Sequence, residues 1–197
     1  MSGLGHHSGL QIFNDSGLCQ HIVKGDIGIP QDSCMPNDDE PRPYFILGDD
    51  VFALRKWMMK PYSDRYLSKE KRIYNYRISR GRRVSENAFG IMAQRWGVLL
   101  TTMFQHPINA RIIVQACVCL HNIMRIRYGY LQNPFLDSED ADHNLIPGSW
   151  RDAGFMQSLE ALQARDRATL LGMQQREYLC KYFNSPAGSV SWQDKMI

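Results

Sequence analysis

The sequence contains no apolar run near the roughly eighteen residues that a membrane-spanning helix requires, so it predicts no membrane segment. Its first residues, Met1–His7, lack the charged and then apolar order of a signal peptide. The five cysteines are odd in number and scattered, which favours reduced thiols over a disulfide framework. A net charge of +3 is too small to indicate a nucleic-acid ligand by itself. These absences favour a soluble protein of the cytosol or nucleus.

What the sequence does contain is the composition of a folded domain. Hydrophobic residues make up 44% and charged residues 22%, close to globular averages, which excludes wholesale disorder. At 197 residues the chain can bury one good core. Cys117 and Cys119 fall in an apolar run that predicts a helix, where positions i and i+2 diverge and cannot hold one zinc ion. We therefore predict buried, inert thiols.

The first third of the chain predicts one strand among short helices and loops. A short helix is predicted at 11–23, with Asn14, Asp15 or Ser16 as its cap, followed by a proline-rich surface loop at 25–43. A strand buried on both faces is predicted at Tyr44–Leu47. A short helix is then predicted at Phe52–Met59, and Pro61 ends it.

The remaining two thirds predict helices. Apolar residues recur at helical spacing after residue 86, which predicts an amphipathic helix with one inward stripe, made by Phe89, Met92, Trp96, Leu99 and Met103. A second helix is predicted at 109–127, after Pro107, with Ile113, Ala116, Leu120 and Ile123 as its inward stripe. Beyond it we predict an acidic linker at 137–142, a polar helix at 155–182 and an extended end at 184–197.

One segment carries a strong cluster of positive charge. Between residues 69 and 83, seven basic residues face a single acid, Glu70: Lys69, Lys71, Arg72, Arg77, Arg80, Arg82 and Arg83. Clustered charge of this kind favours binding to phosphates of a nucleic-acid backbone. A solvated basic loop remains the alternative.

Two acids stand where a metal site could form. Asp49 follows the predicted strand, and Glu86 lies three residues before Phe89, on the same helix face. Magnesium and manganese ions prefer such hard oxygen ligands and need only a few carboxylates. From spacing alone, however, Asp49 also fits a turn or helix-cap aspartate, and Glu86 a glutamate in the first turn of a helix. Asp50 could be a spare ligand, but its side chain diverges from that of Asp49.

Four blocks of the sequence resemble PIF/Harbinger-type transposase-derived nucleases of the DDE superfamily. The blocks are Pro43–Tyr62, Asn75–Ile91, Leu120–Asn122 and Ser185–Gln193. In this resemblance Asp49 matches the second catalytic aspartate and Glu86 the catalytic glutamate. His121 matches a recurring family position, and on its apolar helix we interpret it as a structural, hydrogen-bonded histidine.

The resemblance implies a fold, a chemistry and partners. The expected fold is α/β, a partial ribonuclease H-like nuclease core with one clear buried strand, several long helices and its N-terminal strands missing. The nuclease domain would span 1–130, with an acidic linker and helical tail at 131–197. Asp49 and Glu86 would hold divalent magnesium or manganese for hydrolysis of DNA. A Myb-like DNA-binding protein would be a partner. The chain would be nuclear, with the cytoplasm as the alternative.

The sequence also departs from the family pattern. Residues 8–16 resemble the stretch just after the first catalytic aspartate, and Gly9-Leu10 stands in place of the usual Ser-Asp pair. We therefore expect that aspartate and its strand to be missing, with two consequences. Metal would bind weakly, and Tyr44–Leu47 would form an exposed apolar edge.

Three hypotheses remain open. The chain is a truncated, weakly active or inactive nuclease, a catalytically dead DNA- or protein-binding remnant of a transposase, or a fragment that does not fold stably.

Overall fold

The computed structural model describes residues 9–128, 135–153 and 168–197. By their contacts these residues form two units, one made of 9–82 with 168–197 and the other of 83–128 with 135–153. The chain is mixed α/β, with helices dominating a few two-residue strands, so the predicted fold class is confirmed. The division predicted at residue 130 stays a prediction. Among the described helices, none combines the length and apolarity needed to cross a membrane.

The first unit begins with two short helices in place of the single one predicted. They are α1, Gly9–Asn14, and α2, Gly17–Lys24. Ser16 is the cap that the structure uses, because its hydroxyl accepts a hydrogen bond from the Cys19 amide at 3.1 Å. Gly25 ends α2 in the left-handed region at φ 76°, where its amide bonds back to the helix carbonyls.

Two small sheets follow. Strand β1, Ser33–Cys34, pairs antiparallel with β2, Pro41–Arg42, inside the predicted loop, and β3, Ile46–Leu47, pairs in parallel with β4, Met58–Met59. The predicted strand is therefore present but short. It is also not buried on both faces, since Ile46 is 42% exposed. The physical reason is that β3 has one strand partner in the described structure, so its other edge stays open.

The helix predicted at Phe52–Met59 is wrong. Met58 and Met59 belong to β4 instead, and the carbonyl of Leu54 accepts a hydrogen bond from the Thr169 amide at 3.1 Å. Leu54 also packs so closely on Gly172 that a Cβ there would lie 2.9 Å from the Leu54 carbonyl oxygen. Tertiary contacts thus hold this segment as a tight turn, closed by Arg55 and Met58, and a short strand, against its local helical pattern.

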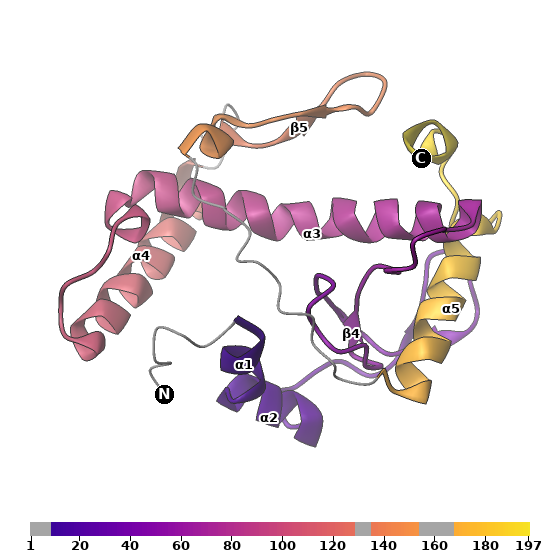
Figure 1. Cartoon of the computed structure of the whole chain (residues 1–197), viewed down its shortest axis with the longest axis horizontal. Helices are drawn as coiled ribbons and strands as arrows, with labels where there is room; N and C mark the ends of the chain where they lie inside the picture. Colours follow the sequence, from indigo (N-terminus) through magenta and orange to yellow (C-terminus); the bar gives the residue numbers. More distant parts are fainter. Residues whose placement is uncertain (1–8, 129–134, 154–167) are drawn as a thin grey trace. The chain divides into compact units, whose positions relative to one another are not determined.

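The core of the first unit lies between helices that are far apart in sequence. Helix α3, Lys69–Arg95, packs its first half against α5, Leu170–Asn184 (Figure 1). Their buried residues join others from the loops in one cluster: Leu54, Met59, Tyr62, Ile73, Tyr74, Ile78, Leu179, Cys180, Tyr182 and Phe183. A short 3-10 helix, η4, Gln193–Met196, stands in the end that was predicted to be extended. Residues 155–167 of the predicted 155–182 helix lie outside the described residues.

Helix α3 is longer than predicted and absorbs the basic segment. Glu86 therefore lies well inside the helix and not in its first turn. The predicted inward stripe is wrong at Phe89, which is 56% exposed, whereas the neighbouring Ile91 and Ala93 are buried. It is also wrong at Leu99 and Met103, because α3 ends at Arg95. A Cβ at Gly90 would lie 2.2 Å from the Trp150 ring, so the helix turns its small residues inward to admit that ring.

The second unit continues through the 3-10 helix η1 (Gly97–Leu100) and the helix α4 (Pro107–Tyr128). Strands β5 (Ser138–Glu139) and β6 (Leu145–Ile146) then pair as a hairpin, which the 3-10 helix η3 (Ser149–Ala153) follows. Pro107 is the first residue of α4, so that prediction is confirmed to within two residues. The acidic segment predicted as a linker forms the hairpin.

Two details of α4 differ from expectation. Its buried residues are Cys117 and His121, while Leu120 and Ile123 of the predicted inward stripe are 45% and 47% exposed. Cys119 is exposed as well, so only one of the two thiols predicted to be buried is so. All five cysteines are free thiols, as predicted.

Candidate active site

Asp49 lies in a tight turn directly after β3. Its Oδ1 accepts a hydrogen bond from the Val51 amide at 3.1 Å, and its carbonyl accepts one from Phe52 at 3.4 Å. The turn depends on Gly48, where a Cβ would lie 2.8 Å from the Met58 sulfur. Asp49 thus makes the contacts of a turn aspartate.

A lysine accompanies this turn. The Lys60 ammonium donates to the Asp50 carbonyl at 2.7 Å. Partial burial lowers the pKa of Lys60, and the charges of Asp50 and Asp49 oppose that shift. The environment of Asp49 therefore already includes a positive charge.

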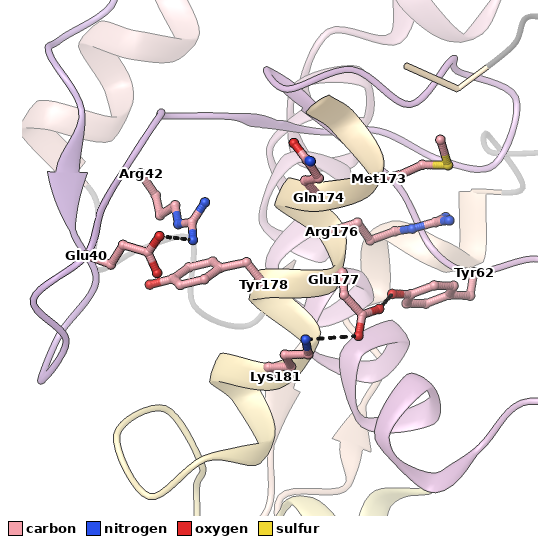
Figure 2. Close-up of a pocket in the computed structure, with 9 residues that line it drawn as sticks. All are labelled: Glu40, Arg42, Tyr62, Met173, Gln174, Arg176, Glu177, Tyr178 and Lys181. Carbon is pink, nitrogen blue, oxygen red and sulfur yellow. Dashed lines mark hydrogen bonds and ion pairs between the residues drawn. The ribbon is translucent and has the colours of Figure 1, made fainter. Parts of the chain in front are cut away.

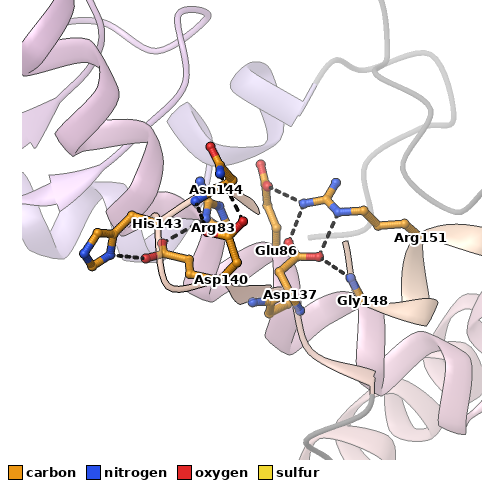
Figure 3. Close-up of polar contacts among 10 residues, drawn as sticks. Arg83, Glu86, Asp137, Asp140, His143, Asn144, Gly148 and Arg151 are labelled. Carbon is orange, nitrogen blue, oxygen red and sulfur yellow. Dashed lines mark hydrogen bonds and ion pairs between the residues drawn. The ribbon is translucent and has the colours of Figure 1, made fainter. Parts of the chain in front are cut away.

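Glu86 shares an arginine with a buried aspartate in the second unit. Figure 3 shows Arg151 between the two carboxylates. Its Nε lies 2.9 Å from Asp137 Oδ1 and its Nη2 lies 2.5 Å from Asp137 Oδ2. The same Nη2 lies 3.9 Å from Glu86 Oε2. Asp137 is therefore the closer partner of Arg151, and Glu86 forms a longer ion pair with the same guanidinium.

The Asp137 carboxylate is fully enclosed. Its side chain has 0% exposure, and the Gly148 amide also donates to Oδ1 at 2.8 Å. Burial alone raises the pKa of Asp137, but the hydrogen bonds from Arg151 and Gly148 outweigh burial and hold the pKa below its ordinary value. The bond to Asp137 in turn raises the pKa of Arg151. The pair is therefore charged throughout the neutral range.

The part of α3 that follows Glu86 contacts the 135–153 arm, which is the segment that contains Asp137 and Arg151. Asn87 Oδ1 accepts from the Trp150 ring nitrogen at 2.7 Å and from the Asp137 amide at 3.1 Å. Gly90 leaves room for Trp150, which is 2% exposed, and Gln94 donates to the Ser149 carbonyl at 3.3 Å. These contacts explain why Arg151 lies beside Glu86.

The hairpin of the arm makes a second set of contacts. Arg83 Nη1 lies 3.3 Å from Glu139 Oε1, and Glu139 Oε2 lies 3.4 Å from His143 Nδ1. Asp140 closes the turn by accepting from the amides of Asp142 and Asn144 at 2.8 and 2.9 Å. The acids of the predicted linker thus stabilise a turn and an ion pair.

The seven basic residues of the predicted nucleic-acid surface have different surroundings. Lys69 pairs with Asp194 at 2.8 Å, and Lys71 pairs with Asp64 at 2.9 Å. Arg72 is exposed. Arg83 holds the hairpin, as described above, and Arg82 is half-buried. DNA binding by these residues stays a prediction.

The C-terminal block packs on the basic face of α3. Arg77 donates to the Gly188 carbonyl and to Gln193 Oε1, both at 3.1 Å, and burial lowers its pKa. The Arg80 guanidinium lies 4.2 Å from the centre of the Trp192 ring, which also meets Tyr76 edge-on. Arg77 is therefore a structural residue, whereas Arg80 lies on an aromatic platform.

With Arg151 in place, the described arrangement does not fit a divalent cation at Glu86. Carboxylates are the right ligand type, but Glu86 faces a fixed guanidinium, and among the described residues no group of three acidic, histidine or cysteine side chains could hold a metal ion. Asp49 belongs to the first unit and Glu86 to the second.

His121 is buried, as its structural interpretation requires. The predicted hydrogen bond is not seen at Nδ1, which has no partner in the described part of the chain. Burial lowers the pKa of His121, and the charges of Arg95 and Arg125 lower it further. A neutral imidazole is the result.

The first unit also has an open pocket of about 760 Å³ (Figure 2). Neither Asp49 nor Glu86 is among its lining residues, and its charges pair with one another: Arg42 with Glu40, and Lys181 with Glu177 at 3.8 Å. Two of its arginines also lie over tyrosine rings, Arg42 at 3.7 Å from the Tyr178 centroid and Arg176 at 4.0 Å from the Tyr62 centroid.

Sequence reasoning missed Arg151, Asp137 and Asn87. Arg151 and Asp137 are 14 residues apart in the sequence, and Asn87 and its partner Trp150 are 63 residues apart. Helical and strand periodicity relate only near neighbours, so no spacing in the sequence signals these contacts.

Comparison with curated proteins and with solved structures found no match. A family model described as DDE superfamily endonuclease matches residues 3–122, a range that includes Asp49 and Glu86 and ends before Asp137 and Arg151. Because this match covers more than half of the 197 residues, the chain belongs to the DDE superfamily endonuclease family.

Proposed function

We propose that this chain is a PIF/Harbinger-type, transposase-derived endonuclease that hydrolyses DNA phosphodiester bonds slowly and requires magnesium or manganese. The observation that carries the proposal is family membership, together with the positions of Asp49 and Glu86 inside the matched segment. Endonucleases of this family generally use divalent metals and act on DNA. Asp49 and Glu86 are the proposed catalytic residues.

Slow turnover is proposed because both acids are engaged. The Asp49 carboxylate accepts a hydrogen bond from a backbone amide and has the Lys60 ammonium nearby, and the Glu86 carboxylate forms an ion pair with Arg151. A cation near a carboxylate offsets part of the charge that would attract a metal ion. Small misplacements of catalytic groups can cost about a hundredfold in rate.

Substitution of the two acids tests the proposal. We expect Asp49→Asn and Glu86→Gln each to abolish manganese-dependent nicking of a supercoiled plasmid. Asp50→Asn is the matched control, because Asp50 is the exposed neighbour of Asp49 and contacts Lys60 through its backbone carbonyl. Nicking that survives both acid substitutions would come from another site or a contaminant, and the proposal would fall.

We further propose that the first half of α3 binds the DNA backbone. Arg72, Tyr76 and Arg80 recur every four residues and so share one face of the helix. Arg72 is exposed and Arg80 lies over Trp192, which is the combination of positive charge and aromatic surface that suits nucleic acid. A face that is merely solvated is the alternative.

Salt dependence distinguishes the two. If Arg72 and Arg80 each neutralise one phosphate, replacing both with Gln lowers the slope of log K against log salt by about 1.8, at roughly 0.9 per contact. Arg65→Gln is the control, because Arg65 is exposed in the loop before α3. An unchanged slope in the double variant would leave the face merely solvated.

A second candidate function is a catalytically inactive DNA- or protein-binding remnant of a transposase. The Glu86–Arg151 contact favours it, because a catalytic carboxylate is paired internally. This candidate predicts that DNA binding persists in Glu86→Gln and that no form of the folded chain nicks DNA.

Nuclear localisation and a Myb-like DNA-binding partner complete the proposal. The family resemblance supports both, and the basic segment supports nuclear localisation. A fluorescent fusion that stays in the cytoplasm would contradict the first. Co-purification with a Myb-domain protein tests the second, and failure to recover one from nuclear extract would count against it.

A further inference from the structure

Arg151 is held in place by contacts that do not involve Glu86. Its guanidinium fork meets both oxygens of Asp137, and the fully buried Asp137 is fixed in turn by the Gly148 amide at 2.8 Å. Two parallel bonds to a carboxylate define both the position and the plane of a guanidinium. The positive charge is therefore fixed in space while the arm is in place.

That charge lies beside the Glu86 carboxylate. Arg151 Nη2 is 3.9 Å from Glu86 Oε2, and the Glu86 side chain keeps 23% exposure. A metal ion bound to this carboxylate would lie within a few ångströms of the guanidinium, and like charges so close repel strongly at the surface of a protein.

The contact depends on the arm as a whole. Asn87, the residue after Glu86, and Gly90, one turn beyond it, hold Trp150, which is the residue before Arg151. Asp137 and Arg151 both lie beyond the segment that matches the family model, whereas Glu86 lies within it. The arm thus adds a feature to the family segment.

We propose that Arg151, clamped by Asp137, is a built-in counter-ion for Glu86 that keeps divalent cations from binding there while the 135–153 arm is docked. The inference rests on the proposed function, because it takes Glu86 as the residue that meets the cation. The arm then acts as an internal inhibitor, and release of Arg151 opens Glu86 to magnesium or manganese.

The test is manganese binding to the purified chain, measured by the electron paramagnetic resonance signal of free manganese. Removal of Arg151 alone would strand the buried Asp137 charge and could unfold the arm. The test variant is therefore Asp137→Asn with Arg151→Gln, a neutral pair that can still hydrogen bond. A second variant, Asp137→Leu with Arg151→Met, replaces the ion pair with apolar residues of similar size.

Both double variants remove the Arg151 cation beside Glu86 and also the Asp137 anion on its far side, so the net charge stays the same and the two changes partly cancel. We expect manganese to bind several-fold more tightly, by about tenfold at most, because the removed cation lies nearer to Glu86. Adding Glu86→Gln should abolish the gain. Arg111→Gln is the control for loss of an arginine elsewhere, because Arg111 is exposed on α4, and the manganese affinity of this variant should stay within about twofold of the original chain.

The outcomes separate the inference from the function on which it rests. If Glu86→Gln weakens manganese binding but both folded double variants bind as the original chain does, Arg151 does not oppose the cation and the inference is overturned while the proposed function stands. If Glu86→Gln changes nothing in any background, Glu86 meets no cation, and both are overturned.

Discussion

Replacing Gly90 with Ala tests the packing that places the 135–153 arm on α3. A Cβ at Gly90 would lie 2.2, 2.4 and 2.9 Å from three atoms of the Trp150 indole. These distances are far below normal carbon contacts, and the clashing atoms belong to a rigid ring that is 2% exposed. Trp150 therefore has to move, or the arm has to leave.

The magnitude follows from what the ring loses. Overpacking of a core costs about 1–3 kcal/mol, and complete loss of a buried Trp costs about 3–5 kcal/mol. Ala gains about 1 kcal/mol over Gly in a helix interior, which offsets part of this loss. We expect a net fall of about 2–3 kcal/mol in the free energy of unfolding, with the hydrogen bond from Trp150 to Asn87 broken.

Urea unfolding and hydrogen exchange of the 135–153 arm measure the effect. The control is Gly97→Ala, because nothing lies within 4 Å of a Cβ at Gly97, and its stability should change by less than about 0.5 kcal/mol. Equal stability and unchanged protection of the arm in Gly90→Ala would refute the described packing of Trp150.

Three further substitutions have defined outcomes. Asp137→Asn should lower the free energy of unfolding by about 3 kcal/mol at pH 7 because it breaks a buried ion pair. Since the pKa of Asp137 in the folded chain is held below its ordinary value of 3.8, the stabilisation is complete above that pH and is lost as the pH falls through the lower folded pKa. The difference in unfolding free energy between the original chain and the variant should therefore be smaller at pH 2 than at pH 7. Arg77→Gln should cost about 2 kcal/mol in thermal unfolding through its lost bonds to Gly188 and Gln193, and a change below about 0.5 kcal/mol would contradict its structural role. Ser16→Ala should weaken α2 by about 1 kcal/mol, seen as faster amide exchange in that helix, and unaltered exchange would exclude the cap.

The sequence could predict the fold where local signals agreed with packing. Pro107 set the start of α4 within two residues, and Ser16 was among the predicted caps. The helix expected at Phe52–Met59 failed because contacts with β3 and Thr169 hold that segment in a turn and a strand, and no local pattern encodes those contacts. Long-range partners decide such segments, and one sequence does not reveal them.

The site divides in the same way. Asp49 and Glu86 could be singled out because a family pattern lies over them, and the family match supports that class of protein. Arg151 could not, because its role follows from an aspartate 14 residues away and from a Trp pocket at Gly90. The charge that opposes a metal ion at Glu86 is a property of tertiary structure alone.

The most direct test of the nuclease proposal is nicking of supercoiled plasmid in manganese, with the original chain and Glu86→Gln compared at equal concentration after both are shown to unfold cooperatively. We predict slow conversion to open circles by the original chain, stopped by chelation of the metal and absent in Glu86→Gln. Equal nicking by both proteins, or none by a folded original chain, would contradict the proposal.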